Sequence, residues 1–234
     1  MRIEGTVALV TGANRGIGRA IADALLERGA AKVYAGVRDV ARVGDPRLVP
    51  VALDVTDAEA VAAAAAELAD VQVLVNNAGI GRPGAPLSAG LGDARAQLET
   101  NYLGLVATTQ AFAPVLAANG GGAIVNVLSI ASFVGSTQLA TYAASKAAAW
   151  SYSNSSRVEL AGQATHVVGV HVGFVDTDLT AGLEVEKIPA SVVAGAALDA
   201  LEDGRPEVLV DEQTRAVKAA LPNDQEQLYA PLMG

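Results

Sequence analysis

Apolar residues occur along this chain in seven short runs, and longer stretches with helical periodicity separate these runs. Several runs are apolar at consecutive positions, which is typical of strands that are buried on both faces of a parallel sheet. The runs that we expect to form strands are residues 7–10, 32–37, 48–53, 71–75, 123–128, 166–172 and 207–210. Their alternation with helices predicts a doubly wound α/β fold, with a mainly parallel sheet and helices on both of its faces.

Between the runs, apolar side chains recur every three or four residues, as they do along one face of a helix. Ile17, Ile21 and Leu25 form one such stripe. A longer stripe predicts one continuous helix, and its members are Leu98, Tyr102, Leu105, Thr109, Phe112 and Leu116. Further helices are expected at the alanine-rich residues 62–66, from about residue 141 to residue 160, and after residue 210 as far as Leu221, where a polar tail begins.

Length and composition indicate one folding unit. The chain has 234 residues, of which 51% are hydrophobic, and this is enough to bury a large core. Because no linker rich in proline or serine divides the chain, we interpret residues 1–234 as a single domain, in which the last ~20 residues form a divergent helix and tail.

Charge and residue usage argue against several classes of function. The formal net charge of −9 disfavours a nucleic-acid partner, since phosphate backbones select basic surfaces. The chain has no cysteine and two histidines, His166 and His171, so a metal site is not expected. There is neither an apolar stretch of ~18 residues nor a signal-peptide pattern, and we therefore expect a cytoplasmic protein without a membrane partner.

A glycine-rich turn follows the first predicted strand and opens the first predicted helix. It reads Thr11-Gly12-Ala13-Asn14-Arg15-Gly16-Ile17-Gly18. Glycine lets the backbone approach phosphate oxygens, and the N-terminus of a helix favours negative charge, so this turn suits the pyrophosphate of a dinucleotide. Glycines at such a junction can also serve only to make a tight turn, and the motif alone leaves that alternative open.

Tyr142 and Lys146 stand four residues apart on one predicted helix, and Ser129 lies upstream at the end of an apolar strand. A phenol of pKa ~10 is a poor proton donor or acceptor at neutral pH, but a nearby ammonium favours its ionised form and lowers that pKa. This trio predicts proton transfer to a carbonyl oxygen. Taken singly, each residue has a structural alternative, because a serine can cap a turn and a tyrosine and a lysine at this spacing can form a surface pair.

Further motifs occur together with this turn and this trio. They are Asp54-Val55, Asn76-Asn77-Ala78-Gly79, Asn101 and Val175-Asp176-Thr177. In their order and spacing, the motifs closely resemble those of the short-chain dehydrogenases/reductases, over roughly residues 5–212. The resemblance implies a Rossmann-type sheet and the nicotinamide-dependent interconversion of an alcohol and a carbonyl compound.

The resemblance also implies roles for four residues. Tyr142 would be the general acid in carbonyl reduction, and Ser129 would hydrogen-bond the substrate oxygen. Lys146 would hold the nicotinamide ribose and lower the tyrosine pKa, and Asn101 would anchor a water that relays protons to Lys146. The residues expected to bind the cofactor are Gly12, Asn14, Arg15, Gly16, Ile17, Gly18, Arg38, Asp54, Val55, Asn76, Ala78, Gly79, Tyr142, Lys146, Val175 and Thr177. The Asn-rich turn that starts at Asn76 could instead only join neighbouring strands, and Asp54 could only begin the next helix.

The end of the second predicted strand indicates which nicotinamide cofactor is used. Family members that use NAD usually carry an acidic residue there, whereas this chain has Val37, followed by Arg38. Arg38 and Arg15 can converge on a 2′-phosphate, so the predicted cofactor is NADP(H). Two alternatives stay open, since a shift of one residue in the alignment would place Asp39 at this position and Arg38 could be a solvated loop residue.

On the substrate side, the chain has Val172 where the family often has a proline. His171, beside it, is expected to be packed or hydrogen-bonded rather than catalytic. The residues that could line the cleft are Phe133, Gln138, Phe174, Leu179 and Leu183. They predict a hydrophobic ketone or aldehyde as the substrate, although apolar side chains of this kind can equally belong to the core.

The region after the last predicted strand bears on assembly. The family commonly ends this strand with Asp-Gly-Gly, whereas this chain continues with Asp211-Glu212-Gln213, which puts the usual tetramer in doubt. The two long helices could form a homodimer with Trp150 as an anchor, unless Trp150 belongs to the core.

Together, these observations predict an NADPH-dependent carbonyl reductase or alcohol dehydrogenase that uses Asn101, Ser129, Tyr142 and Lys146. One alternative is a sensor that binds the cofactor but has lost turnover, and another is a scaffold that binds no dinucleotide. The intact catalytic set argues against a sensor, because a protein that only binds has no need of a phenol and an ammonium so placed.

Overall fold

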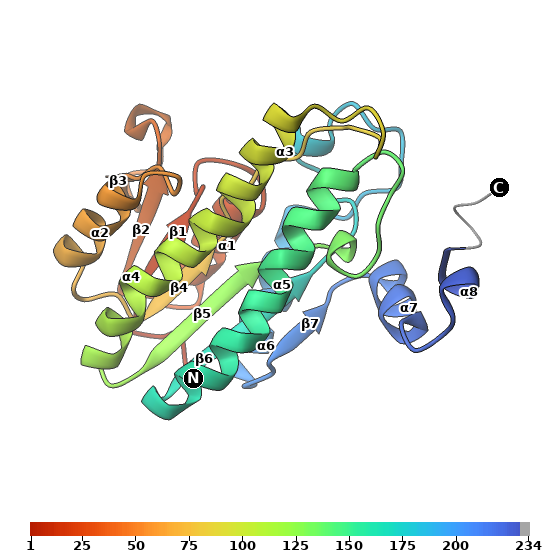
Figure 1. Ribbon diagram of the computed structural model, residues 1–234. Coiled ribbons are helices and arrows are strands. Elements are labelled where there is room, and N and C mark those ends of the chain that lie inside the picture. Colours follow the sequence, from red (N-terminus) through yellow and green to blue (C-terminus); the bar gives the residue numbers. More distant parts are fainter. Residues whose placement is uncertain (230–234) are drawn as a thin grey trace.

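The apolar runs form the strands of one seven-stranded sheet in the computed structural model, which describes residues 1–229 (Figure 1). The strands are β1 (Val7–Thr11), β2 (Lys32–Val37), β3 (Val49–Ala52), β4 (Val73–Asn76), β5 (Gly122–Val127), β6 (Thr165–His171) and β7 (Glu207–Leu209). Every neighbouring pair is parallel. The seven predicted strands are therefore confirmed, and their ends lie within two residues of the predicted ones.

The strand order is β3-β2-β1-β4-β5-β6-β7, so the direction of the winding reverses between β1 and β4. Val10 of β1 pairs with Ala35 of β2 on one side and with Val75 of β4 on the other. Ligands of open α/β sheets bind beyond the carboxyl ends of the strands at such a reversal. The glycine-rich turn after β1 lies at this point.

Helices cover both faces of the sheet, as the doubly wound fold requires (Figure 1). Two of them, α1 (Gly16–Glu27) and α6 (Ala190–Glu202), pack on one face, where Ile21 and Leu198 join the apolar side chains of the strands. On the opposite face lie α2 (Ala58–Glu67), α4 (Gly104–Ala118) and α5 (Ala140–Leu160). Neighbouring residues of a strand point to opposite faces of the sheet, and helices bury both faces, so consecutive strand residues are apolar.

The predicted helix through Leu98 and Leu116 is confirmed, but it contains a π-helical turn that was not predicted. The chain runs without a break through α3 (Leu91–Leu98), the π-helical turn (Glu99–Leu103) and α4. A π-helical turn inserts an extra residue into the ladder of a helix and is frequent at functional sites. Apolar periodicity cannot reveal it, because the apolar stripe continues across the insertion.

The C-terminal region forms α7 (Glu212–Ala220) and a short α8 (Gln225–Tyr229). Asp211 caps α7 by accepting a hydrogen bond from the backbone N–H of Thr214 at 2.8 Å. The helix predicted after residue 210 is thus confirmed, whereas residues 230–234 of the predicted tail lie outside the described residues. Across residues 1–229, none of the helices combines the length and the apolar character needed to span a bilayer.

Candidate active site

The glycine-rich turn between β1 and α1 has the geometry that a pyrophosphate requires. Gly16 has a positive φ of 56°, which disfavours a residue with a Cβ. A Cβ at Gly18 would clash with the side chain of Asn77 and the carbonyl of Gly12. Arg15 precedes α1 in an extended conformation and no side chain caps the first turn, so the backbone N–H groups of this helix end can bind an anion.

Thr11, at the end of β1, joins this turn to β4. Its buried hydroxyl donates to Val75 O at 3.2 Å and accepts from the backbone N–H groups of Asn77 and Ala78, both at 3.0 Å. The side-chain amide of Asn77 donates back to Thr11 O at 2.9 Å. These bonds hold the ends of β1 and β4 together at the reversal of the sheet, so they define the floor of the candidate site.

Asn76, the last residue of β4, uses its side chain within the protein. The amide donates to Asn126 Oδ1 at 2.9 Å and to Thr109 Oγ1 at 3.1 Å, and the carbonyl accepts from Thr108 Oγ1 at 2.7 Å. The structural role expected for this turn is confirmed. The expected cofactor contact of Asn76 stays a prediction, and the two N–H donors of its side chain are already paired between β5 and α4.

Asn101 lies in the π-helical turn and is 2% exposed. Its Oδ1 accepts from the Ile80 N–H at 2.8 Å, and its Nδ2 donates to Ile80 O at 2.8 Å and to Ser145 Oγ at 3.0 Å. The side chain therefore ties the loop after β4 to α5. The solvated position that a helical asparagine could have occupied is excluded.

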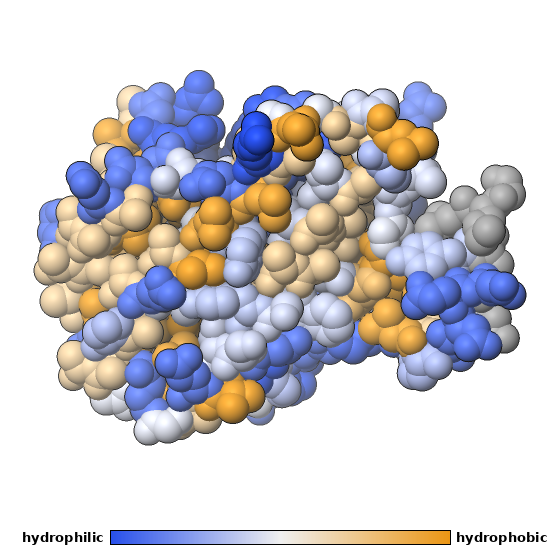
Figure 2. Space-filling view, viewed as in Figure 1, coloured by the Kyte–Doolittle hydropathy of each residue, from blue (hydrophilic) through white to orange (hydrophobic). Residues whose placement is uncertain are grey.

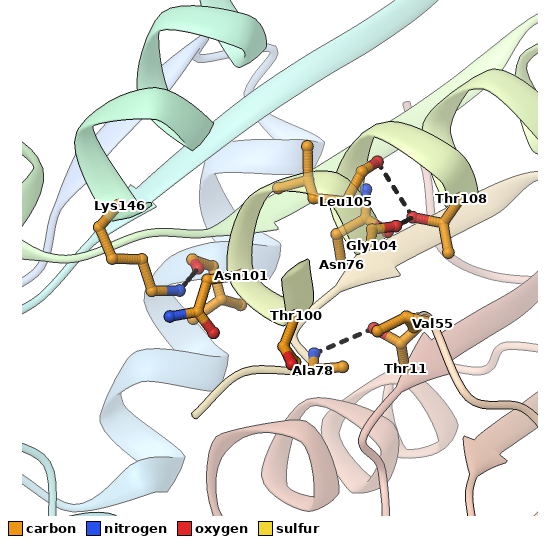
Figure 3. A pocket seen from close by; sticks show the side chains of 11 residues that line it. Thr11, Val55, Asn76, Ala78, Thr100, Asn101, Gly104, Leu105, Thr108 and Lys146 are labelled. Atoms are coloured by element: carbon orange, nitrogen blue, oxygen red, sulfur yellow. Dashed lines mark hydrogen bonds between the residues drawn. The ribbon is translucent and has the colours of Figure 1, made fainter. Parts of the chain in front are cut away.

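Asn101 and Lys146 line the same small cavity, and Figure 3 shows their side chains next to each other. The cavity has a volume of about 10 Å³, close to the space that one water molecule requires. Lys146 Nζ donates to Val127 O at 2.8 Å, at the end of β5. Other residues of the cavity wall are Thr11, Val55, Asn76, Ala78, Thr100, Gly104, Leu105 and Thr108. Gly79 borders it, since a Cβ there would meet Asn101 Oδ1 and Lys146 Nζ.

Tyr142 and Lys146 share one face of α5, as predicted, and Lys146 Nζ lies 5.9 Å from the centre of the Tyr142 ring. Burial raises the pKa of the Tyr142 phenol, and the Ser129 side chain acts against this shift. The Lys146 ammonium donates to Val127 O and not to the phenol, and the expectation that it lowers the phenol pKa stays a prediction. Burial also lowers the pKa of Lys146 to about 8. The phenol therefore stays protonated at neutral pH, as a proton donor must be.

Ser129 lies just after β5, as expected, and it also caps a turn, which was its structural alternative. Its Oγ accepts from the Ala131 N–H at 3.1 Å, so the residue caps the short turn Ile130–Ser132. The same side chain is near enough to Tyr142 to affect the pKa of the phenol. Both hydroxyl groups thus lie at the carboxyl end of the sheet, beside Lys146.

Arg38 is exposed just beyond β2. Burial opposes the ionisation of the nearby Asp54, but hydrogen bonds from Thr56 and the charge of Arg38 outweigh it, so the pKa of Asp54 lies below its usual value. Asp39, the acid that an alignment shift would bring into play, is used elsewhere, because it accepts from the Ala41 N–H at 3.1 Å and pairs with Arg42 at 3.3 Å. In this loop the Arg38 guanidinium therefore lies near Asp54, whereas the Asp39 carboxylate is bonded within the loop.

The segment after β6 returns to the glycine-rich turn. Thr177 packs on Gly16, and Val175 is buried and forms a parallel bridge with Ile188. The Arg15 guanidinium pairs with Asp178 at 2.6 Å in an exposed ion pair. The structure therefore brings Arg15, Val175 and Thr177 to one edge, as the sequence motifs required.

The five residues predicted to line a substrate cleft do not form one group. Leu179 and Leu183 are exposed, and Leu179 packs close to Gly81 across the site. Gln138 is exposed, with its carbonyl accepting from the Gly84 N–H at 2.7 Å, and Phe174 is half-buried. Phe133 is 9% exposed and stacks on His171 with 4.2 Å between ring centres. This packing argues against the predicted substrate contact of Phe133.

Some positioning residues were not predicted. Gln97 is fully buried, accepts from the Arg82 N–H at 2.9 Å and donates to Thr141 Oγ1 at 2.7 Å, so it ties the loop after β4 to the start of α5. Ser145 holds Asn101, and its place inside the Tyr-Ala-Ala-Ser-Lys motif was the available signal. Gln97 gave no signal, because a glutamine in a helix is usually solvated.

Comparison with known proteins identifies the family. Residues 6–187 match the family model described as short chain dehydrogenase. The chain is 41% identical to cis-4-hydroxycyclohexanecarboxylate dehydrogenase of Sinomonas cyclohexanicum over 77% of each protein, and 34% identical to 3-oxoacyl-(acyl-carrier-protein) reductase FabG of Vibrio cholerae over 82% of each. This protein therefore belongs to the short-chain dehydrogenase family of oxidoreductases, and the resemblance seen in its motifs is confirmed.

A solved structure is similar along the full length. A short chain dehydrogenase from Burkholderia cenocepacia, crystallised in complex with NADP, is 43% identical and superposes with a TM-score of 0.95 over 100% of both chains. The similarity includes the C-terminal region, which departs from the commonest family pattern.

Proposed function

We propose that this protein interconverts a carbonyl compound and an alcohol with NADP(H) as the cofactor. The observation that carries the proposal is the grouping of Ser129, Tyr142 and Lys146 at the carboxyl end of β5, beside the Asn101 cavity. The uncapped start of α1 and the close approach of Gly18 to Asn77 fit a dinucleotide pyrophosphate, so the residues present suit this cofactor. When bound, the dinucleotide supplies or accepts the hydride.

In carbonyl reduction, Tyr142 donates its phenolic proton to the oxygen of the substrate as the carbonyl carbon is reduced. Ser129 stabilises the same oxygen through a hydrogen bond while negative charge develops on it. The phenolate that remains recovers a proton from Lys146, and the cavity between Lys146 and Asn101 has room for the water of the relay. In alcohol oxidation the same protons move in reverse.

Two arginines support the choice of NADP(H) over NAD(H). Arg38 and Arg15 carry positive charge at the end of β2 and in the glycine-rich turn, where a 2′-phosphate would need it. Asp39 would favour NAD, but its carboxylate caps the next turn. The similar Burkholderia cenocepacia protein was crystallised with NADP, which agrees with this choice.

A hydrophobic ketone or aldehyde remains the proposed substrate. Leu179 and Leu183 expose apolar surface, and Leu179 packs close to Gly81 in the loop after β4. The named relatives act on cis-4-hydroxycyclohexanecarboxylate and on a 3-oxoacyl chain carried by acyl-carrier protein, so in both cases the oxygenated carbon belongs to a carbon ring or chain.

The proposal is tested by following NADPH absorbance with the purified protein and a panel of ketones and aldehydes. We expect consumption that Tyr142→Phe abolishes while NADPH still binds. Tight binding of NADPH without turnover of any compound would favour the sensor, and failure to bind dinucleotides would favour the scaffold.

The cofactor choice is tested by the ratio of kcat/KM with NADPH to that with NADH. Arg38→Ala should lower this ratio about tenfold or more, because a charge-assisted pair with the phosphate is lost. Arg42→Ala is the matched control, since Arg42 is exposed in the same loop but is paired with Asp39. An unchanged ratio in Arg38→Ala, or a preference of the wild type for NADH, would contradict the choice.

We also propose a homodimer formed through α4 and α5. No residue of α4 is charged, and the surface over these two helices is mostly apolar or weakly polar in Figure 2. Trp150 is half-buried and packs edge-on against Phe133, with 4.9 Å between ring centres, so the proposed interface does not depend on it. Gln110→Lys on the exposed side of α4 should shift the protein to a monomer in sedimentation experiments. Val192→Lys on α6 is the control, and a dimer that survives Gln110→Lys would contradict this interface.

A further inference from the structure

A buried group of side chains lies directly behind Ser129. His171, the last residue of β6, is fully buried, and its Nδ1 lies 3.2 Å from Ser129 O. The imidazole stacks on Phe133 with an angle of 21° between the rings. On the other side of the imidazole, Nε2 lies 3.3 Å from Glu207 Oε1 on β7.

A second layer holds the carboxylate of Glu207 in place. Lys218 on α7 donates to Glu207 Oε1 at 3.1 Å. The same ammonium lies 4.5 Å from the centre of the Phe133 ring and 4.6 Å from that of Trp150. Contact with His171 lowers the pKa of Glu207 to about 2, against the effect of burial and with help from Lys218, so this carboxylate is ionised at neutral pH.

The chemistry of the ring nitrogens decides the direction of the bond to Ser129. A carbonyl oxygen only accepts hydrogen bonds, so Nδ1 must carry a proton and donate it to Ser129 O. In this ring orientation Nδ1 lies beside Ser129 O, and Nε2 lies 3.3 Å from Glu207 Oε1 without forming a hydrogen bond, whereas the other flip would turn both nitrogens away from these oxygens.

The bond acts on the peptide from which the Ser129 side chain projects. The ladder to β6 holds this stretch through Leu128 N–H to Val170 O at 2.8 Å and through Ile130 N–H to Val172 O at 2.9 Å, and the Ile130 N–H lies in the same planar peptide unit as Ser129 O. The Ser129 carbonyl faces the ring of His171, and it also accepts from the Ser132 N–H at 2.9 Å. Loss of the imidazole therefore removes one of the three hydrogen bonds on the peptide unit next to the Ser129 side chain, which weakens the hold on the position of its hydroxyl.

We propose that His171 is a positioning residue for Ser129 and that its ring is held in place by packing against Phe133 and the ion pair of Glu207 and Lys218. This inference rests on the proposed function of Ser129. The residues that affect the reaction then include Glu207 of β7 and Lys218 of the divergent helix α7, in addition to those of the cleft. Small displacements of a group that hydrogen-bonds the reacting oxygen reduce the rate strongly, whereas they leave cofactor binding intact.

The test compares three variants of the full-length protein with NADPH and the ketone that the wild type reduces fastest. His171→Leu fills the space but donates no hydrogen bond. His171→Asn has an amide nitrogen close to the position of Nδ1 and can restore the bond. His166→Leu is the matched control, because His166 lies on the same strand and its ring bonds Arg205 O at 3.1 Å on the exposed side, away from Ser129.

We expect kcat to fall at least about tenfold in His171→Leu with an unchanged Kd for NADPH, to recover substantially in His171→Asn, and to stay unchanged in His166→Leu. Glu207→Gln should lower kcat in the same direction, and it covers the case that His171→Leu does not fold. Full kcat in His171→Leu would overturn the proposal. So would equal losses in His171→Leu and His171→Asn that follow their thermal stability, since this would indicate a merely structural histidine.

Failure of the proposed function would appear separately, as a wild type that reduces no compound in the panel. In that case crystal structures of the variants provide the readout. The proposal then requires the Ser129 hydroxyl to be displaced in His171→Leu and to keep its position in His171→Asn. An undisplaced hydroxyl in His171→Leu would refute it.

Discussion

The hydrogen bonds of the Thr11 hydroxyl, which join the ends of β1 and β4, permit a test of how the site is assembled. Thr11→Val keeps the shape of the side chain, which is 1% exposed, but removes its hydroxyl. The backbone N–H groups of Asn77 and Ala78 and the carbonyl of Val75 then lose their partner. At about 1 kcal/mol for each lost hydrogen bond, and more where the orphaned group stays dry, we expect the free energy of unfolding to fall by about 2–4 kcal/mol.

Thr11→Ser is the matched control, because it keeps the hydroxyl and removes only a methyl group, at a loss of about 1 kcal/mol. The free energies are measured by urea-induced unfolding of the three proteins, and equal m-values show that they unfold the same structure. In addition, NADPH should bind about tenfold more weakly to Thr11→Val, since the loop of Asn77 and Ala78 forms the floor of the site. If Thr11→Val is as stable as Thr11→Ser, the hydroxyl does not hold β1 and β4 together and the reasoning is refuted.

Two further predictions concern Lys146. Burial lowers the pKa of Lys146 from 10.5 to about 8. Below pH ~8 the folded protein therefore contains a buried ammonium, which lowers the free energy of unfolding. This destabilisation decreases as the pH rises from ~8 to the pKa of the unfolded state, ~10.5. Lys146→Met should therefore raise the free energy of unfolding at pH ~7 by up to about 3 kcal/mol while turnover is lost, and a less stable variant in urea unfolding would contradict this. The second prediction is that kcat/KM for carbonyl reduction falls above pH ~8, as Lys146 loses the proton that restores Tyr142, and a profile that stays flat to pH ~10 would exclude Lys146 from the relay.

Local patterns predicted the framework well. All seven strands were recognisable because both faces of a parallel sheet are buried, which makes the strands apolar at consecutive positions. The glycine-rich turn was recognisable for a different reason, since Gly16 and Gly18 meet steric demands that few other residues can meet. Tyr142 and Lys146 share a helix face because four residues make about one turn.

Long-range contacts limited the prediction of the site. The π-helical turn that directs Asn101 toward Ile80 was hidden inside one apolar stripe. Phe133 was expected in the substrate cleft, but its ring lies between His171 and Lys218, which come from β6 and α7. Apolar character alone does not distinguish the wall of a cleft from the core behind it.

The amino-acid sequence by itself determined the order of strands and helices, the glycine-rich turn and the spacing of Tyr142 and Lys146, because these depend on steric rules within a few residues. Only the tertiary structure decided where the Lys146 ammonium points, that Asn76 is used up within the protein, and that His171 faces the peptide of Ser129. Hydrogen bonds and burial between residues far apart in the chain set these features, and they exist only once the sheet has brought those residues together.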